Sequence, residues 1–127
     1  MHEVEIAAIL CAWLGGQTEV RHNVALDAGD HSIRVDCETA TEVIEVGLDD
    51  KAGSRDSLVQ ALFAADLTGK TPVVILIDRD GVEDKIEYQV RRASVAAGVR
   101  YEVRDVDALI RWQMGAYFRS VQIAPGS

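Results

Sequence analysis

The stretch SIRVDCETATEVIEVG (residues 32–47) contains two segments in which apolar and polar residues alternate. Alternation with a period of two is typical of a β-strand that is buried on one face. Residues 38–41 separate the two segments and have the length of a tight turn. The stretch therefore predicts a β-hairpin with strands at residues 32–37 and 42–47.

The predicted hairpin separates an apolar face from a face that carries carboxylates. The apolar face is expected to hold Ile33, Val35, Cys37, Ile44 and Val46. A turn centred in residues 38–41 places Asp36 opposite Val43. Glu45 then lies diagonally from Asp36 on the other face, with Cβ atoms roughly 6–7 Å apart.

Two carboxylates at that spacing repel each other unless a proton or a cation lies between them. Mg²⁺ or Mn²⁺, bound by one or two carboxylates and water, would satisfy such a pair, as it does in phosphoryl-transfer enzymes. The competing interpretation is a solvent-facing strand side with scattered acids, on which Arg34 pairs with Glu45. The hairpin pattern alone leaves both interpretations open.

The rest of the chain predicts helices alternating with strands. Helices are expected at residues 2–14, 55–67 (with Ser54 as the N-cap), 82–97 and 106–119, and further strands at 17–24, 73–77 and 99–103, with a polar turn at 25–31. The order α-β-β-β-α-β-α-β-α predicts an α/β fold in which helices flank one central mixed sheet. We expect a single domain over residues 1–127.

Composition narrows the functional classes. No apolar run approaches the roughly 18 residues of a membrane span, and no signal peptide is apparent, so we expect no membrane association. Cys11 and Cys37 form no CxxC pair, and we expect two buried, reduced thiols in a cytoplasmic protein. The net charge is −8, and residues 1–51 hold eleven acids against three bases. Such acids keep a protein soluble or hold hard cations.

Several motifs, in their order and spacing, resemble the PD-(D/E)xK nuclease superfamily, which includes many restriction enzymes and archaeal Holliday-junction resolvases. The resemblance covers about residues 2–78 and rests on HEVEIAAILCAWLGG, TEVR, IRVDC, VIEVG and DSLVQALFAADLTGKTPVVILI. The chain is also similar to small bacterial and prophage-encoded members of this superfamily. The resemblance implies a restriction-endonuclease-like αβββαβ core, followed here by an extra C-terminal helix-strand-helix.

The resemblance also implies a set of metal ligands. In the superfamily a glutamate often comes from the first helix, an aspartate from the second strand and a second acid from the third strand. The matching residues are Glu3, Asp36 and Glu45. Glu5 and Glu19 remain alternatives to Glu3 as the residue that completes the site.

One motif position departs from the superfamily. A lysine usually follows two residues after the acid of the third strand, and this chain has Gly47 there. Lys51 could take over that role through its long, flexible side chain; otherwise it is an ordinary loop lysine and the enzyme is weakened or inactive. With Gln60 from the next helix, the candidate catalytic residues are Asp36, Glu45, Lys51 and Gln60.

Two functions are compatible with these features. The first is a Mg²⁺- or Mn²⁺-dependent endonuclease that hydrolyses DNA phosphodiester bonds, and small nucleases of this kind often work as homodimers. The second is a catalytically inactive nuclease-fold module for binding or assembly, of phage or mobile-element origin. Gly47 and the negative net charge favour the second function, because negative charge disfavours unaided DNA binding.

A further motif, DRDG (78–81), resembles the start of a calcium-binding loop. The remaining ligand positions of such a loop are missing. We therefore expect a turn at these residues.

Overall fold

The computed structural model describes residues 2–123 and confirms the predicted order of elements. The helices and strands are α1 (Glu3–Leu14), β1 (Gln17–Leu26), β2 (Gly29–Glu38), β3 (Glu42–Leu48), α2 (Ser57–Thr68), β4 (Thr71–Asp78), α3 (Lys85–Ala96), β5 (Arg100–Asp105) and α4 (Val106–Ile123). A short 3₁₀ helix, η1 (Ala52–Asp56), precedes α2.

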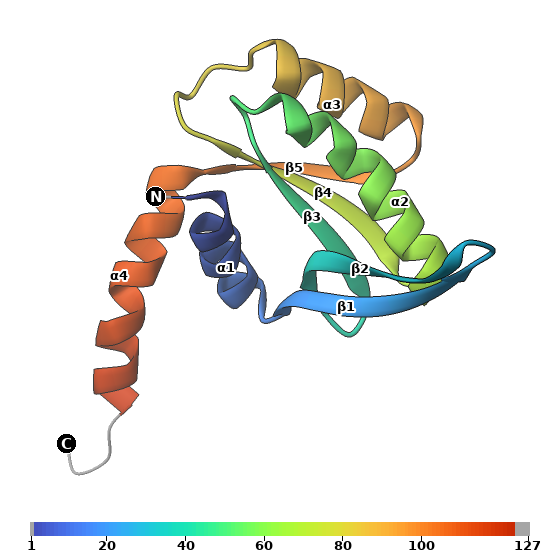
Figure 1. The fold of residues 1–127 in the computed structure, drawn as a ribbon. Helices are drawn as coiled ribbons and strands as arrows, with labels where there is room; N and C mark the ends of the chain where they lie inside the picture. The colour runs from blue at the N-terminus through green and yellow to red at the C-terminus, as the bar shows by residue number, and fades with distance from the viewer. Residues whose placement is uncertain (1, 124–127) are drawn as a thin grey trace.

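The strands form one five-stranded mixed sheet in the order β1-β2-β3-β4-β5 (Figure 1). Strands β1, β2 and β3 are antiparallel neighbours, whereas β3, β4 and β5 run parallel. Helices α1 and α4 pack on one face of the sheet, and α2 and α3 pack on the other. The α/β class and the mixed sheet flanked by helices therefore agree with the prediction.

Strand β4 forms the centre of the core. Val73, Ile75 and Ile77 pack toward α1 and α4, whereas Val74 and Leu76 pack toward α2 and α3. All five side chains are fully buried. A continuous apolar run is what a strand covered on both faces requires.

The hairpin between β2 and β3 has a different register from the predicted one. The Thr39 N–H donates to the Glu42 carbonyl over 3.0 Å, and Thr39 Oγ1 accepts the N–H of Glu42 over 3.0 Å. The turn therefore lies at residues 39–42, because a threonine hydroxyl at its first position stabilises it there. Cys37 pairs with Ile44, and one further step places Asp36 across from Glu45 rather than Val43.

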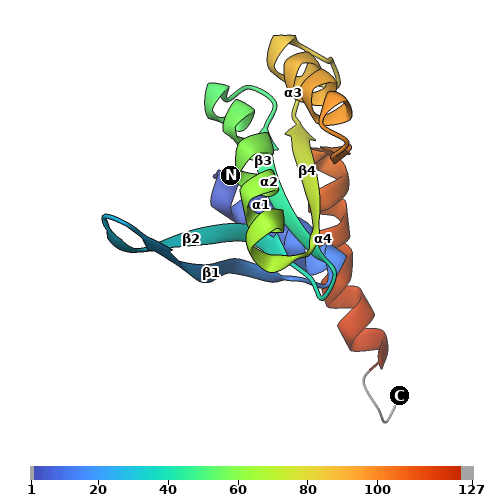
Figure 2. The ribbon, with the colours of Figure 1, turned by 90° about the vertical axis from the view of Figure 1, so that its right-hand side faces the viewer.

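The first hairpin is longer than predicted. Strands β1 and β2 pair from Gln17↔Glu38 to Leu26↔Gly29, so the polar turn expected at 25–31 contains only residues 27 and 28. Pairing continues through polar residues because the two strands hydrogen-bond to each other without needing burial. Figure 2 shows this hairpin extending beyond the rest of the sheet.

The predicted single apolar face is divided at Asp36. Val35 packs with Val43 and Ala64 under α2, whereas Cys37 packs with Ile44 under α1. Residues two apart in a regular strand share a face, so the alternation breaks between them. On β1 the residue across from Asp36 is Glu19, whose φ is +50°.

The cysteines are joined, contrary to the expectation of free thiols. A disulfide links Cys11 of α1 to Cys37 of β2, with their Cα atoms 5.5 Å apart. Helix α1 lies directly against the strand because residue 16 is glycine: a Cβ there would lie 2.7 Å from Cys37 Sγ. The disulfide removes the ground on which a reducing compartment was expected.

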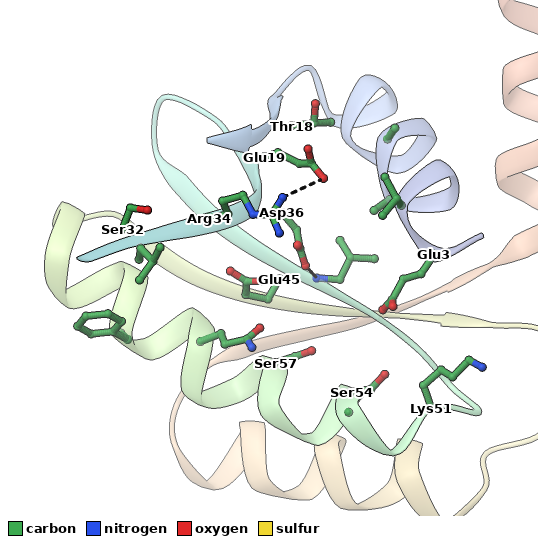
Figure 3. A pocket seen from close by; sticks show the side chains of 18 of the residues that line it. Glu3, Thr18, Glu19, Ser32, Arg34, Asp36, Glu45, Lys51, Ser54 and Ser57 are labelled. Carbon is green, nitrogen blue, oxygen red and sulfur yellow. Dashed lines mark hydrogen bonds and ion pairs between the residues drawn. The ribbon is translucent and has the colours of Figure 1, made fainter. Parts of the chain in front are cut away.

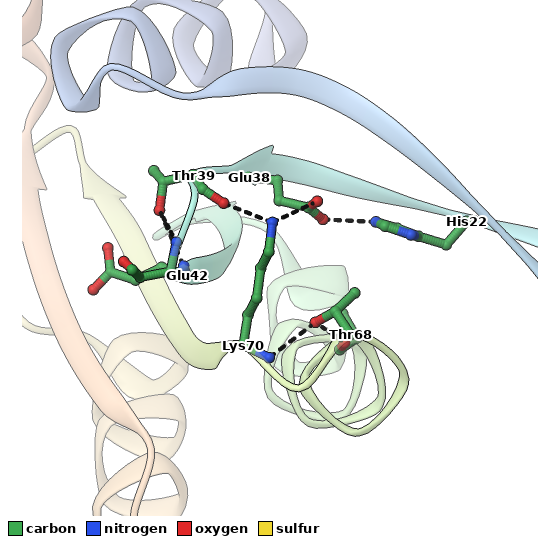
Figure 4. A network of polar contacts seen from close by, with 8 residues as sticks. His22, Glu38, Thr39, Glu42, Thr68 and Lys70 are labelled. Carbon is green, nitrogen blue, oxygen red and sulfur yellow. Dashed lines mark hydrogen bonds and ion pairs between the residues drawn. The ribbon is translucent and has the colours of Figure 1, made fainter.

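A polar network holds the turn between β2 and β3 (Figure 4). Glu38 contacts His22 Nε2 over 2.7 Å and Lys70 Nζ over 3.0 Å, and Lys70 also donates to the Thr39 carbonyl. Burial alone would raise the pKa of Glu38, but the hydrogen bonds from His22 and Lys70 outweigh it and lower the pKa. The network ties β1, β2 and the loop before β4 together.

Among residues 2–123, no helix combines the length and the hydrophobicity needed to cross a membrane.

Candidate functional site

A cavity of about 840 Å³ lies between α1, the β1–β2 hairpin, β3, η1 and α2 (Figure 3). It is lined by the predicted ligands and catalytic residues Glu3, Asp36, Glu45, Lys51 and Gln60. These residues come from five separate segments of the chain. The fold thus brings the predicted residues together in one place.

Asp36 lines this cavity from β2. Its Oδ2 accepts the backbone N–H of Val46 over 2.9 Å. The pairing of β2 with β3 is recorded from Glu38↔Val43 to Cys37↔Ile44. At the next position the Asp36 side chain supplies the acceptor for a β3 N–H, and this contact fixes the carboxylate beside β3.

Glu45 is a buried acid across from Asp36 in the register of β2 and β3. Only 2% of its surface is exposed, and the charge of Asp36 acts on its carboxyl group. Burial raises the pKa of Glu45 to about 9, and the charge of Asp36 adds to the rise. Glu45 is therefore protonated at neutral pH when no cation is bound, because a carboxylate pair needs a proton or a cation between its members.

Glu3 enters the cavity from the first turn of α1. Burial raises its pKa, the charge of Asp36 adds to this effect, and Lys51 opposes it. In Figure 3, Glu3 and Lys51 lie to the right of Asp36, whereas the Glu45 side chain lies on the other side of Asp36. The Asp36 charge therefore acts on both predicted partner ligands.

The alternative ligands differ in position. Glu19 lines the same cavity, and its carboxylate lies 4.0 Å from Arg34 Nη1. Arg34 thus pairs with Glu19. The competing interpretation of the hairpin, in which Arg34 pairs with Glu45, is wrong on this point. Glu5 lies outside this cavity, in a groove between α1 and α4.

The surroundings of Gly47 leave no space for the lysine of the superfamily motif. Gly47 shares a face of β3 with Glu45, and a Cβ at this position would lie 2.6 Å from Ser54 Oγ and 2.9 Å from Leu76 Cδ2. The predicted N-cap role of Ser54 is wrong, because Ser54 lies within η1 and donates to the Leu48 carbonyl over 2.7 Å. Lys51 lines the cavity from the loop that follows β3.

A second group of acids was missed in the sequence. Carboxylate oxygens of Asp49, Asp78 and Asp80 lie within 4.8 Å of one another and could hold a metal ion. Asp49 follows β3 and Asp78 ends β4, and these parallel strands pair up to Leu48↔Ile77. Acids directly after neighbouring parallel strands meet at one edge of a sheet, and this was the available signal.

The expected turn at DRDG is present, and it forms part of this acidic group. Asp78 Oδ1 accepts the N–H groups of Asp80 and Gly81. Burial would raise the pKa of Asp78, but these hydrogen bonds outweigh it and lower the pKa. Burial raises the pKa of Asp49, which is 1% exposed.

No protein-family model, curated protein or solved structure matches the chain.

Substitution of Gly47 tests whether the motif position is closed. Gly47→Ala places a methyl group against Ser54 and Leu76, so we expect a loss of about 1–3 kcal/mol in the free energy of unfolding, measured by urea denaturation. Gly53→Ala is the matched control, because a Cβ there meets no atom within 4 Å. Equal stability of the two variants would show that position 47 has room for a side chain.

The pH dependence of stability tests the Asp36–Glu45 pair. The folded pKa of Glu45 is raised from 4.5 to about 9, so its contribution is full below pH 4.5 and is lost as the pH rises toward 9. Glu45→Gln cannot ionise and keeps a donor toward Asp36. In buffer with a chelator, its free energy of unfolding at pH 7 should exceed that of the wild type by about 3 kcal/mol, measured by denaturant unfolding.

Glu38→Gln is the control for this measurement, because it should act with the opposite sign. The folded pKa of Glu38 is lowered, so its stabilising contribution is present above 4.5 and is lost as the pH falls through the folded value. Glu38→Gln should therefore be less stable than the wild type at neutral pH. If the free energy of unfolding of Glu45→Gln and of the wild type changed with pH in the same way, Glu45 would not be protonated in the folded protein at neutral pH.

Proposed function

We propose that the cavity is the active site of a metal-dependent nuclease that hydrolyses DNA phosphodiester bonds on a restriction-endonuclease-like core. One observation carries the proposal: five chemically suited residues from separate segments line one cavity, and two of them, Asp36 and Glu45, lie across from each other on neighbouring strands. Chance placement on a solvated surface would leave these acids dispersed and exposed.

The residues present fit a divalent cation. Glu45 is buried and holds a proton toward Asp36, and a cation between the two carboxylates would replace that proton. Asp36, Glu45 and Glu3 would hold Mg²⁺ or Mn²⁺, which suit carboxylate and water ligands. When bound, such an ion supplies Lewis-acid polarisation of a phosphoryl oxygen.

The surrounding residues have complementary roles in this proposal. Arg34 and Lys51 line the cavity and offer positive charge to a phosphate group. Lys51 stabilises the negative charge that develops as water attacks phosphorus and the bond to the leaving sugar oxygen breaks. Gln60, exposed on α2, donates a hydrogen bond that orients the water or the phosphate.

A specific observation also favours the catalytically inactive module of phage or mobile-element origin as a second candidate. Ser54 and Leu76 occupy the space that a side chain at Gly47 would need, and Asp36 already accepts the Val46 N–H. If the protein is such an inactive module, Asp36 stabilises the pairing of β2 with β3, and the protein binds a partner or a second copy of itself. Cleavage assays separate the two candidates.

The nuclease proposal predicts cleavage of supercoiled, single-stranded or branched DNA in Mg²⁺ or Mn²⁺. Glu45→Gln and Asp36→Asn should each lower the rate at least about 100-fold, because each removes an anionic ligand of the cation. Lys51→Ala should lower the rate by about 10-fold or more with little change in substrate affinity. The readout is the initial rate of nicking by purified protein.

Helix α1 provides a matched pair of variants for the same assay. Glu3→Gln should lower the rate because Glu3 lines the cavity, whereas Glu5→Gln should leave it unchanged because Glu5 lies outside. An undiminished rate in folded Glu45→Gln protein would refute the nuclease proposal. Absence of cleavage on every substrate with either ion would favour the inactive module.

A further inference from the structure

The acidic group at the ends of β3 and β4 is distinct from the cavity. None of Asp49, Asp78 and Asp80 lines the cavity, although Lys51 does, two residues after Asp49. The three carboxylates bring like charges within 4.8 Å, which is costly unless a proton or a cation compensates for it.

Two buried carboxylate oxygens in this region lack a hydrogen-bond partner among the described residues. Asp49 is 1% exposed, and among the described residues no hydrogen-bond donor reaches its Oδ1; its Oδ2 accepts only the Arg79 N–H, over 3.2 Å. Glu87 of α3 is also 1% exposed, and its Oε1 likewise has no donor within the described chain. A buried polar atom without a partner costs about 1–3 kcal/mol, and more when it is charged.

Glu87, on helix α3, belongs to the same acidic environment as the three aspartates at the ends of β3 and β4. Its carboxyl group lies within electrostatic range of both Asp78 and Asp49. It is an independent, buried acid of α3 on which the charges of Asp78 and Asp49 act. A cation among these groups would offset the repulsion between all of them.

We propose that Asp49, Asp78 and Asp80, with Glu87 beside them, form a second site for a hard divalent cation, Mg²⁺ or Ca²⁺. Both ions prefer carboxylate oxygens, and the exposed position of Asp80 leaves room for water ligands. This second site is separate from the proposed nuclease site, because its residues do not line the cavity. An ion could bind there whether or not the cavity is catalytic.

An ion in this second site would clamp the carboxyl ends of β3 and β4. Asp49 directly follows β3, whereas Asp78 ends β4. Two hydrogen bonds join Asp49 to this part of β4 and the residue after it: its N–H donates to the Ile77 carbonyl over 3.0 Å, and its Oδ2 accepts the Arg79 N–H over 3.2 Å. Asp49 also begins the loop that carries Lys51 into the cavity. The ion would therefore order the start of this loop.

Thermal unfolding of the full chain with a chelator, MgCl₂ or CaCl₂ tests the second site. The wild type should gain about 4 °C or more in its unfolding midpoint with at least one of the ions. Asp80→Asn should lose most of that gain; Asp80 is exposed and Asn keeps the acceptor for the Val82 N–H, so the variant should fold. Asp66→Asn, at an exposed acid of α2, is the matched control and should keep the gain.

Asp36→Asn separates the second site from the cavity in the same experiment. It should keep the part of the gain that Asp80→Asn loses, and ion binding should still slow amide hydrogen exchange at residues 49–51. An equal gain in Asp80→Asn and Asp66→Asn would overturn the proposal. So would the absence of any gain in the wild type, or a gain that is abolished by Asp36→Asn alone.

Discussion

The carboxylate of Asp36 is the group on which the rest of the site depends. By accepting the Val46 N–H it satisfies a buried backbone donor at the point where regular pairing of β2 with β3 stops. An unpaired donor there would cost about 1–3 kcal/mol. At the same residue the apolar faces of β2 exchange sides, and the β1–β2 hairpin forms a wall of the cavity. The Asp36 side chain thus both completes the hydrogen bonding between β2 and β3 and lines the cavity.

That arrangement also sets the electrostatics of the cavity. Burial raises the pKa of both Glu45 and Glu3, and the charge of Asp36 adds to the rise in each. Gly47 admits no side chain on the same face, and the largest positive influence on Glu3 comes from Lys51, on the following loop. The chemistry of the cavity therefore depends on a loop whose first residue, Asp49, belongs to the second acidic group.

The parts that could be predicted from the sequence are those that local patterns determine. The continuous run from Val73 to Ile77 indicated a strand buried on both faces, and Gly69 marked the end of α2 with a φ of +74°. The convergence of Glu3, Asp36 and Glu45 on one cavity followed from the resemblance to the PD-(D/E)xK order of motifs. These features depend on hydrophobic burial and on motif order, which a sequence displays directly.

The parts that could not be predicted depend on contacts between distant segments. Thr39 moved the turn through its own hydroxyl, so the register shifted and Asp36 came to lie across from Glu45. The Cys11–Cys37 disulfide required α1 to rest on β2 at Gly16, which no local pattern shows. The grouping of Asp49 with Asp78 needed the parallel register of β3 and β4, although acids placed after two such strands were a visible signal.

The most direct test of the central claim is a ¹³C NMR titration of the Glu45 side-chain carboxyl group, with and without Mg²⁺. We expect a midpoint near the pKa of about 9 in cation-free buffer. We also expect Mg²⁺ to lower this midpoint by more than about one unit, because the cation replaces the shared proton. A midpoint near 4.5 without cations, or one that Mg²⁺ leaves unchanged, would contradict the central claim.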